Sequence, residues 1–457
     1  MLQFLAVPAL VLASWVWLDR LIVRRRNGWA RDSGVADLAL AAAMASCGLV
    51  IILAQVSPLY GNLGWGGVSS RIAAAGGIGL KDLSSMGSSS IDRASSLPAV
   101  AGVIPPLALF LLVSSLGIER LLRLIGWFVV FGLVCLALGI LQVLQGTDSS
   151  VRFFAISNRT EAIGFFANRN HFAAQLYATL LLTVAWTATH ATRPIAPRSP
   201  TSRKFLWTAG LCCVVLLLLS GLALARSRAG ILFVLLAAAA IVAMSPTLVV
   251  AIGRRSRRVS RIFFVAVASV LLLVGQLGAD RFLQRFDTGL VDRMRATLNA
   301  TTYEALREAL PFGTGLGSFP SVYAVYEKSQ NLRPEYANRA HDDWLEFPLE
   351  AGVPGMLLIV LFLIWFSWAL CRIWMRPSTN QDVRLCIAQQ CASLVVLFLL
   401  LHSVVDYPLR TSTMLAYFSA CCGLMVSRPN TSRLAGRRRH VAPGQFSTDP
   451  QFARGFQ

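Results

Sequence analysis

The chain has 457 residues, of which 55% are hydrophobic and only 14% are charged. Soluble globular proteins carry about 25% charged residues, so this composition excludes the soluble globular class. The net charge of +20 would suit a nucleic-acid partner, but the basic residues cluster in short segments between apolar runs, as in "RLIVRRRNGWAR" and "RRSRRVSR". We therefore expect a membrane protein that contacts lipids and binds no nucleic acid.

Apolar runs recur along the whole chain, and each is long enough to cross about 30 Å of hydrocarbon. They predict an all-α polytopic membrane protein with about 11 transmembrane helices, within a range of about 10–12. The Gly/Ser-rich stretch 61–97 is also compatible with a re-entrant or interfacial segment. The predicted spans lie near residues 2–18, 37–56, 98–116, 124–144, 171–188, 205–223, 229–249, 262–278, 350–370, 385–405 and 411–427.

The basic clusters also predict the topology, because Lys and Arg near span ends resist translocation and mark the cytoplasmic side. If the spans alternate, segments 190–204 and 254–261 are cytoplasmic and segment 279–349 is a large outward loop. We divide the chain into N-terminal transmembrane helices with a Gly/Ser-rich outward loop (1–160), a membrane core that includes loop 279–349 (161–427), and a basic cytoplasmic tail (428–457). All nine cysteines lie in or beside apolar runs, which argues against a disulfide framework.

The outward loop contains recognisable local patterns. "TTYEALREAL" predicts a helix with a threonine cap and acids in its first turn. "SVYAVYEKS" predicts a second short helix, and "PFGTGLGSF" between them predicts a turn. Gly313, Gly315 and Gly317 do not fit a dinucleotide fingerprint, which needs G-x-G-x-x-G after a strand. Tight backbone geometry is the favoured reason for these glycines.

Polar residues collect near the outward ends of the predicted spans. In a membrane such residues are costly, so their convergence suggests a functional site. The histidines involved are His171, His341 and His402. The charged residues are Arg169, Arg226, Arg228, Arg293, Arg295, Arg339, Asp406 and Arg410.

The hairpin "LARSRAG" places Arg226 and Arg228 between two apolar runs with almost no loop. One explanation is that both side chains snorkel to lipid headgroups. The other is a fixed anion site, since guanidinium groups bind phosphate in a bidentate manner. For His341 in "NRAHDDWLE", a loop histidine paired with Asp342 or Asp343 is the simpler alternative to a reactive group. The three outward histidines lack the spacing of metal ligands, so we expect no metal and no cofactor.

Taken together, "GFFANRNHFAA", "ARSRAG", "PFGTGLGSF", "AHDDWLEFPLEAGVPG" and "HSVVDYPLR" resemble, in this order, the bacterial O-antigen ligase/polymerase family. The resemblance covers about residues 160–427 and is strongest over 293–355. One position departs from the family pattern, because Asp342 stands where the family usually has asparagine.

The resemblance implies a metal-independent glycosyltransferase of the bacterial inner membrane that acts at the periplasmic face, so that 279–349 would be a periplasmic loop. Its donor would be a glycan on undecaprenyl diphosphate, and its acceptor another lipid-linked glycan (a polymerase) or a lipid A core (a ligase). A chain-length regulator is a further partner that the resemblance suggests. It implies His341 as the catalytic residue and Arg228 and Arg293 as ligands of the donor diphosphate, with Arg226 and Arg295 as reserve candidates.

The chemistry of these residue types fits such a reaction. Fixed arginines can stabilise the negative charge that develops on a diphosphate leaving group, and a neutral histidine can accept the proton of an acceptor hydroxyl. Asp342 or Asp343 is expected to orient the His341 ring. Arg169, His171, Arg339 and Asp406 are expected to support the site. A multi-span transporter of an anionic or lipid-linked substrate is the alternative, and the choice between ligase and polymerase stays open.

Overall fold

The structure is a computed structural model that describes residues 90–154, 158–191, 201–244, 293–331, 337–375 and 383–427, with single positions between 14 and 71. Apart from those single positions, the predicted spans 2–18, 37–56 and 262–278 and the tail 428–457 lie outside the described residues. The side chain of Arg293 also lies outside them.

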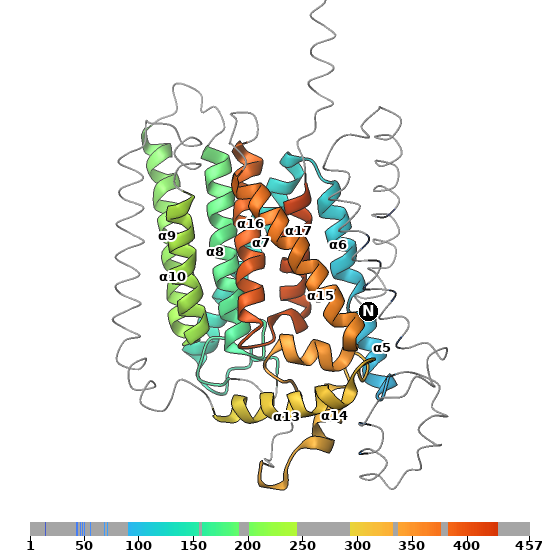
Figure 1. Cartoon of the computed structure of the whole chain (residues 1–457). Coiled ribbons are helices and arrows are strands. Elements are labelled where there is room, and N and C mark those ends of the chain that lie inside the picture. Colours follow the sequence, from blue (N-terminus) through green and yellow to red (C-terminus); the bar gives the residue numbers. More distant parts are fainter. Residues whose placement is uncertain are drawn as a thin grey trace, which may run out of the picture.

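All regular structure in these residues is helical, which confirms the all-α class (Figure 1). The α-helices are α5 (Arg93–Ala101), α6 (Ile104–Ser115), α7 (Ile118–Gln145), α8 (Arg169–Ala191), α9 (Thr201–Ala225), α10 (Arg228–Ala243), α13 (Arg293–Ala309), α14 (Phe319–Tyr326), α15 (Asp343–Met375), α16 (Val383–His402) and α17 (Ser412–Val426). Two short 3-10 turns are η3 (Ser329–Asn331) and η4 (Pro408–Arg410).

The apolar runs predict most of these helices closely. Within the described residues, five helical segments are long and apolar enough to cross a membrane: Ala94–Ser115, Ile118–Gln145, Arg169–His190, Asp343–Met375 and Val383–His402. Three shorter apolar helices match the predicted spans 205–223, 229–249 and 411–427. The chain is therefore a multi-pass membrane protein, and the total of about 11 spans stays a prediction.

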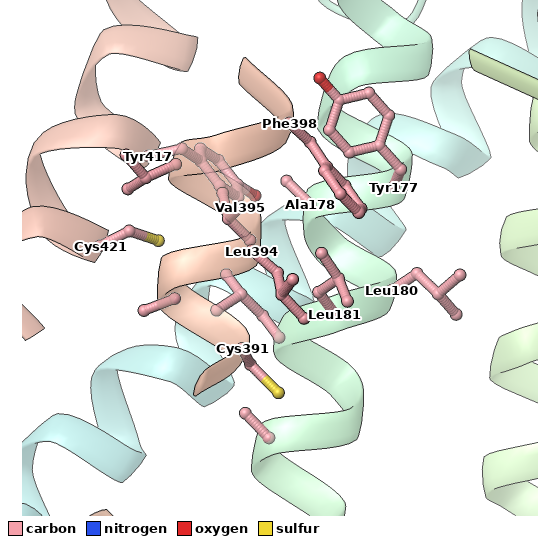
Figure 2. Close-up of a cluster of buried hydrophobic side chains, with 14 of the residues drawn as sticks. Tyr177, Ala178, Leu180, Leu181, Cys391, Leu394, Val395, Phe398, Tyr417 and Cys421 are labelled. Carbon is pink, nitrogen blue, oxygen red and sulfur yellow. The ribbon is translucent and has the colours of Figure 1, made fainter. Parts of the chain in front are cut away.

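Two helices, α8 and α16, form the centre of the bundle. In each of them, 89% of the apolar stretch is buried inside the protein, compared with 33% in α7 and 22% in α15. Figure 2 shows Leu181 of α8 beside Leu394 and Phe398 of α16, with Tyr177 next to Phe398. Helices hydrophobic on all sides are buried by their neighbours, whereas the outer helices keep a face for lipid. The central pair therefore gives the site a rigid support.

The segment that contains α13 and α14 packs across one end of this bundle. α13 and α14 lie across the lower end in Figure 1, against the first part of α15. Both helices predicted for this segment are present, but the threonine cap predicted for the first of them was wrong. α13 begins at Arg293, and Thr302 lies inside it with its hydroxyl bonded to the Leu298 carbonyl. The preceding sequence "RMRATLN" also favours a helix, so α13 begins nearer the N-terminus than predicted.

α15 is bent at Gly352, which has φ 62° and lies outside helical geometry. A Cβ atom at Gly352 would lie 2.3 Å from the Pro311 carbonyl oxygen, and one at Gly313 would lie 2.5 Å from the Glu350 carbonyl oxygen. The turn "PFGTGLGSF" thus crosses the bend at backbone contact distance, where only glycine fits. Gly313, Gly315 and Gly317 all have positive φ, which confirms that they provide tight backbone geometry.

Candidate functional site

The carboxylate of Asp406 lies at the centre of a polar cluster at this end of the bundle. It follows α16 and is fully buried. Its Oδ1 lies 3.1 Å from His341 Nδ1 and accepts the Tyr407 backbone N–H at 3.0 Å. Its Oδ2 accepts the side-chain amides of Asn170 at 2.6 Å and Asn168 at 3.3 Å. With two contacts to each oxygen, the carboxylate is held in one orientation.

The charge state of Asp406 sets the tautomer of His341. Burial alone would raise the pKa of the Asp406 carboxyl, but the hydrogen bond with His341 and the nearby His171 and His402 hold that pKa well below its usual range. Asp406 is therefore ionised and accepts a hydrogen bond, so Nδ1 of His341 carries the proton. The other nitrogen, Nε2, is then the basic one. A quarter of the His341 side chain is exposed, which makes it accessible from outside the bundle.

The backbone at His341 adopts a left-handed conformation with φ 57°. A non-glycine residue in this region costs about 1–3 kcal/mol and needs support from its neighbours. The support comes from both sides of the residue. The Ala340 N–H donates to Glu346 Oε2 at 2.9 Å, and Asp342 Oδ1 accepts the Trp344 N–H at 2.9 Å. The strained turn points the ring away from the acids that follow it in sequence and toward Asp406.

This arrangement corrects the expectation that Asp342 or Asp343 orients the His341 ring. Asp342 instead caps the first turn of α15, a position where aspartate and asparagine are both favourable. Asp343 Oδ2 accepts the Ser403 hydroxyl at 2.8 Å, and its backbone N–H donates to the Ser403 carbonyl at 2.9 Å. Asp342 therefore fixes the start of α15, and Asp343 joins that start to the end of α16. Asp406, not either of these acids, holds the His341 ring.

The arginine hairpin joins α9 to α10 through only two residues, Arg226 and Ser227. Arg226 has φ 51°, a left-handed turn that ends α9. Ser227 caps α10, since its Oγ accepts the Gly230 N–H at 3.1 Å and its hydroxyl donates to Asn170 Oδ1 at 2.8 Å. Arg226 and Arg228 are exposed, and neither pairs with a carboxylate among the described residues. The two guanidinium groups remain available to an external anion.

α13 brings a third cation to the cluster. Arg295 Nη2 lies 3.9 Å from Asp406 Oδ2, with about a third of its side chain exposed. Arg293 is the first residue of α13, but its side chain lies outside the described part. The structure thus brings together His341, the hairpin arginines and Arg295 from segments far apart in sequence.

Three other predicted arginines pair with carboxylates of the protein itself. Arg410 and Arg339 share one network, and Arg169 forms a separate pair. Arg410 lies 2.6 Å from Glu350 Oε2 and within 3.6 Å of Glu346 and Asp343 oxygens. Arg339 pairs with Glu346 at 2.8 Å. Glu346 and Glu350 are fully buried. We call these five residues the inner ion network.

The inner ion network also holds the glycine-rich turn. Glu350 Oε1 accepts the backbone N–H groups of Gly317 at 2.9 Å and Phe319 at 3.3 Å.

Arg169, the remaining predicted arginine, lies outside the inner ion network and pairs with Glu161 at 2.5 Å. Arg169 and Arg339 therefore pair with carboxylates of the protein itself and support the fold of this face.

His171 and His402 are buried beside Asp406. His171 Nε2 lies 3.8 Å from Asp406 Oδ1, and His402 Nδ1 lies 3.2 Å from the Tyr177 hydroxyl. The Tyr407 ring stands edge-on to both His171 and His341, with ring centroids 4.6 and 4.8 Å apart. No group of three or more histidine, cysteine or acidic residues in the described segments has the arrangement of a metal site. His171 and His402 thus place two further imidazole rings near the Asp406 carboxylate.

Sequence reasoning missed Asn170, Ser227 and Tyr407. A capping signal was available for Ser227, because serine before the apolar run of α10 favours a helix start. Asn170 lies between Arg169 and His171 in the quoted motif "GFFANRNHFAA", but its contact with Asp406 spans 236 positions and depends on the tertiary fold. Tyr407 is next to Asp406 in the quoted motif, but its ring contacts depend on the tertiary fold.

Residues 213–360 match a family model described as O-antigen ligase. The match contains the arginine hairpin, α13, the glycine-rich turn and His341, whereas Asn170 and Asp406 lie outside it. No curated protein matches the chain in a sequence search. The family suggests a glycosyl-transferring enzyme of cell-surface polysaccharide or O-antigen synthesis. Residues 213–360 of the chain are thus similar to the O-antigen ligase family.

Proposed function

We propose that the protein transfers a glycan from a polyprenyl diphosphate donor to a hydroxyl of a lipid-linked or lipid A core acceptor, without a metal ion. The single observation that carries this proposal is the His341–Asp406 pair, which connects through Asn170 and Ser227 to two exposed arginines. A base and an anion site held together match the two needs of transfer from a diphosphate leaving group.

The proposed reaction is a single displacement. His341 Nε2 accepts the proton of the acceptor hydroxyl, and the acceptor oxygen attacks the anomeric carbon of the donor sugar. The bond from that carbon to the diphosphate oxygen breaks, and the polyprenyl diphosphate leaves with the electron pair. Arg228 and Arg293 stabilise the charge that develops on it, with Arg226 and Arg295 beside them. Undecaprenyl diphosphate is the lipid carrier that the family suggests.

Asp406 contributes by stabilising the protonated form of His341. The carboxylate accepts a hydrogen bond from the Nδ1–H group of His341 and remains ionised because its pKa is low. It therefore faces the imidazolium with a full negative charge once Nε2 has taken the second proton. Because Asp406 is fully buried, solvent screens its attraction to the imidazolium less than it would in an exposed pair. The strained backbone of His341 fixes the ring so that no reorientation is needed during the reaction.

The proposal is tested by transfer of a labelled glycan in membranes or proteoliposomes that contain the purified protein. We expect His341→Ala to lower the transfer rate about 10²- to 10⁴-fold, the usual cost of removing a general base. His190→Ala is the matched control, because His190 lies at the opposite end of α8. Wild-type transfer by His341→Ala at equal expression would remove the base from the proposal. Movement of intact lipid-linked glycan without transfer would favour the transporter alternative.

The active face is proposed to be periplasmic. The polar end of the bundle lies opposite the end of α8 and the start of α9. These ends border the basic sequence 190–204, which the positive-inside rule assigns to the cytoplasm. Alkaline phosphatase fused after Ser329 is expected to be active, and a fusion after Ser260 is expected to be inactive. The reverse pattern would place the site on the cytoplasmic face and contradict a periplasmic reaction.

A further inference from the structure

We infer that Asn170 is a positioning residue that sets the arginine hairpin against the His341 base. This inference rests on the proposed function and concerns a residue outside the family match. Asn170 is the second residue of α8, at the point where α8 meets the start of α10. Its side chain connects the two halves of the site, one from the hairpin and one from the segment after α16.

The amide of Asn170 is used in both directions. Its Oδ1 accepts the Ser227 hydroxyl at 2.8 Å, and its Nδ2 donates to Asp406 Oδ2 at 2.6 Å. Ser227 lies between Arg226 and Arg228, so the bridge reaches the backbone that carries both guanidinium groups. Asp406 contacts His341 through its other oxygen. One side chain thus joins the anion site to the base through three short contacts.

Only a side chain that accepts and donates at this length can make the bridge. Aspartate matches the shape of asparagine but offers no donor when ionised, and it would place a second anion beside Asp406. Alanine and serine are too short to reach both partners. The bridge therefore requires the amide, while a role in helix packing alone would not distinguish Asn170 from a similar apolar side chain.

Close packing makes the position of the hairpin sensitive to this contact. A Cβ atom at Gly230 would lie 2.7 Å from the Ala173 Cβ. The first turn of α10 therefore packs directly on α8, close to Asn170 in the first turn of that helix. The Ser227–Asn170 bond fixes the rotation of α10 about this contact. A displacement of about 1 Å between reacting groups can cost about 10²-fold in rate.

Transfer kinetics in proteoliposomes test the inference. We expect Asn170→Ala to raise the donor KM and lower kcat, with a combined loss near 10²-fold in kcat/KM. Ser227→Ala should change the same two constants, and Ser227→Thr, which keeps the hydroxyl, should restore them. The double variant Asn170→Ala/Ser227→Ala should be no worse than the more severe single variant, because both remove one bridge. Ser220→Ala, an exposed serine of α9 away from the site, should match the wild type.

Asn170→Asp gives a readout that a structural role would not produce. When its carboxyl is protonated, it donates to Asp406 and still accepts from Ser227, as the amide does. The transfer rate of this variant relative to wild type should rise as pH falls from about 8 to about 6, because adjacent carboxylates favour a shared proton. The charged or titratable groups near the bridge are Arg226, Arg228, His341, His171, His402, Arg295, Tyr407 and Asp406.

Several results would overturn the inference. These are wild-type kcat and donor KM in Asn170→Ala, losses that multiply in the double variant, or a pH-independent ratio for Asn170→Asp. The His341→Ala variant separates this inference from the proposed function. If His341→Ala is inactive and Asn170→Ala is normal, only the bridge fails. If His341→Ala transfers glycan normally, the base on which the bridge depends fails as well.

Discussion

Two groups of arginines lie at the same end of the bundle in opposite surroundings. In the inner ion network, Arg410 is enclosed by three carboxylates, two of which are fully buried. In the hairpin, Arg226 and Arg228 are exposed and pair with no carboxylate in the described part of the chain. Both groups have the same side-chain chemistry, and the sequence places both near the outward ends of the predicted spans. Their surroundings assign them different work.

A buried arginine surrounded by acids cannot bind a phosphate without losing those partners, so the inner ion network holds the fold. Its carboxylates anchor the bend of α15 and the glycine-rich turn, and thereby place His341. An exposed arginine on a short, rigid connection contributes little to stability, but its charge is free for a ligand. The comparison therefore predicts that variants of the two groups separate stability from activity.

Removing Arg410 should have the largest effect on stability. Arg410→Ala leaves Glu350, Glu346 and Asp343 without their shared cation, and breaking a buried pair in this way costs about 3–5 kcal/mol. We expect a lower unfolding midpoint in detergent and less folded protein in membranes. Unfolding followed by intrinsic tryptophan fluorescence measures the effect.

Two further variants sharpen this result. Arg226→Ala should change the free energy of unfolding by less than about 0.5 kcal/mol, as for other exposed residues. Arg410→Leu combined with Glu350→Gln should lose less than the sum of the single losses, because fewer charges are left unpaired. Equal destabilisation by Arg226→Ala and Arg410→Ala would remove the distinction between the two groups.

The helices of this fold could be predicted because the membrane requires long apolar runs. The run 171–188 became Arg169–Ala191, and the run 385–405 became Val383–His402. The bend at Gly352 could not be predicted in the same way, because the apolar run 350–370 continues across it. That bend depends on a backbone crossing with Pro311 and Gly313, which is a tertiary contact.

The sequence predicted candidate site residues that the structure brings together, but it did not predict their hydrogen-bond partners. Charges at span ends pointed to His341 and the hairpin, because such residues are costly near lipid. The partner of His341 was assigned by sequence proximity to Asp342 or Asp343. The true partner lies 65 positions away, and the positive φ of His341 turns the ring toward it. No periodicity or spacing encodes that turn.

Asp406 contacts His341 and Asn170 and belongs to neither arginine group. Asp406→Asn should have an effect on stability between those of Arg410→Ala and Arg226→Ala, and this effect should depend on pH. Hydrogen bonds to a charged group are each worth about 1.5–3 kcal/mol, so we expect a loss of this size at pH 7. The folded-state pKa of Asp406 lies below its unfolded value of about 3.9. Its ionised form therefore stabilises the protein above about pH 4, and this contribution is lost as the pH falls toward the folded-state pKa.

The measurement is the difference in unfolding midpoint between wild type and Asp406→Asn across pH. The difference should be constant from about pH 8 to about pH 5 and should close below about pH 4. Asp148→Asn, which removes an exposed acid after α7, should show a much smaller difference. A gap that closes near neutral pH would mean that Asp406 is not held ionised by its neighbours.

Replacing Arg228 by lysine should have the smallest effect on the fold and the most specific effect on the reaction. Lysine keeps the positive charge, so a residue that only contacts lipid headgroups tolerates it. A lysine cannot reproduce two parallel hydrogen bonds to a diphosphate. We therefore expect Arg228→Lys to raise the donor KM and to lower transfer about tenfold, which corresponds to about 1.4 kcal/mol, with an unchanged unfolding midpoint. Arg123→Lys, an exposed arginine of α7 near its first turn, is the matched control. Full transfer by Arg228→Lys, at wild-type donor KM, would return this side chain to a lipid-contacting role and leave Arg226 and Arg295 as the remaining cations of the anion site.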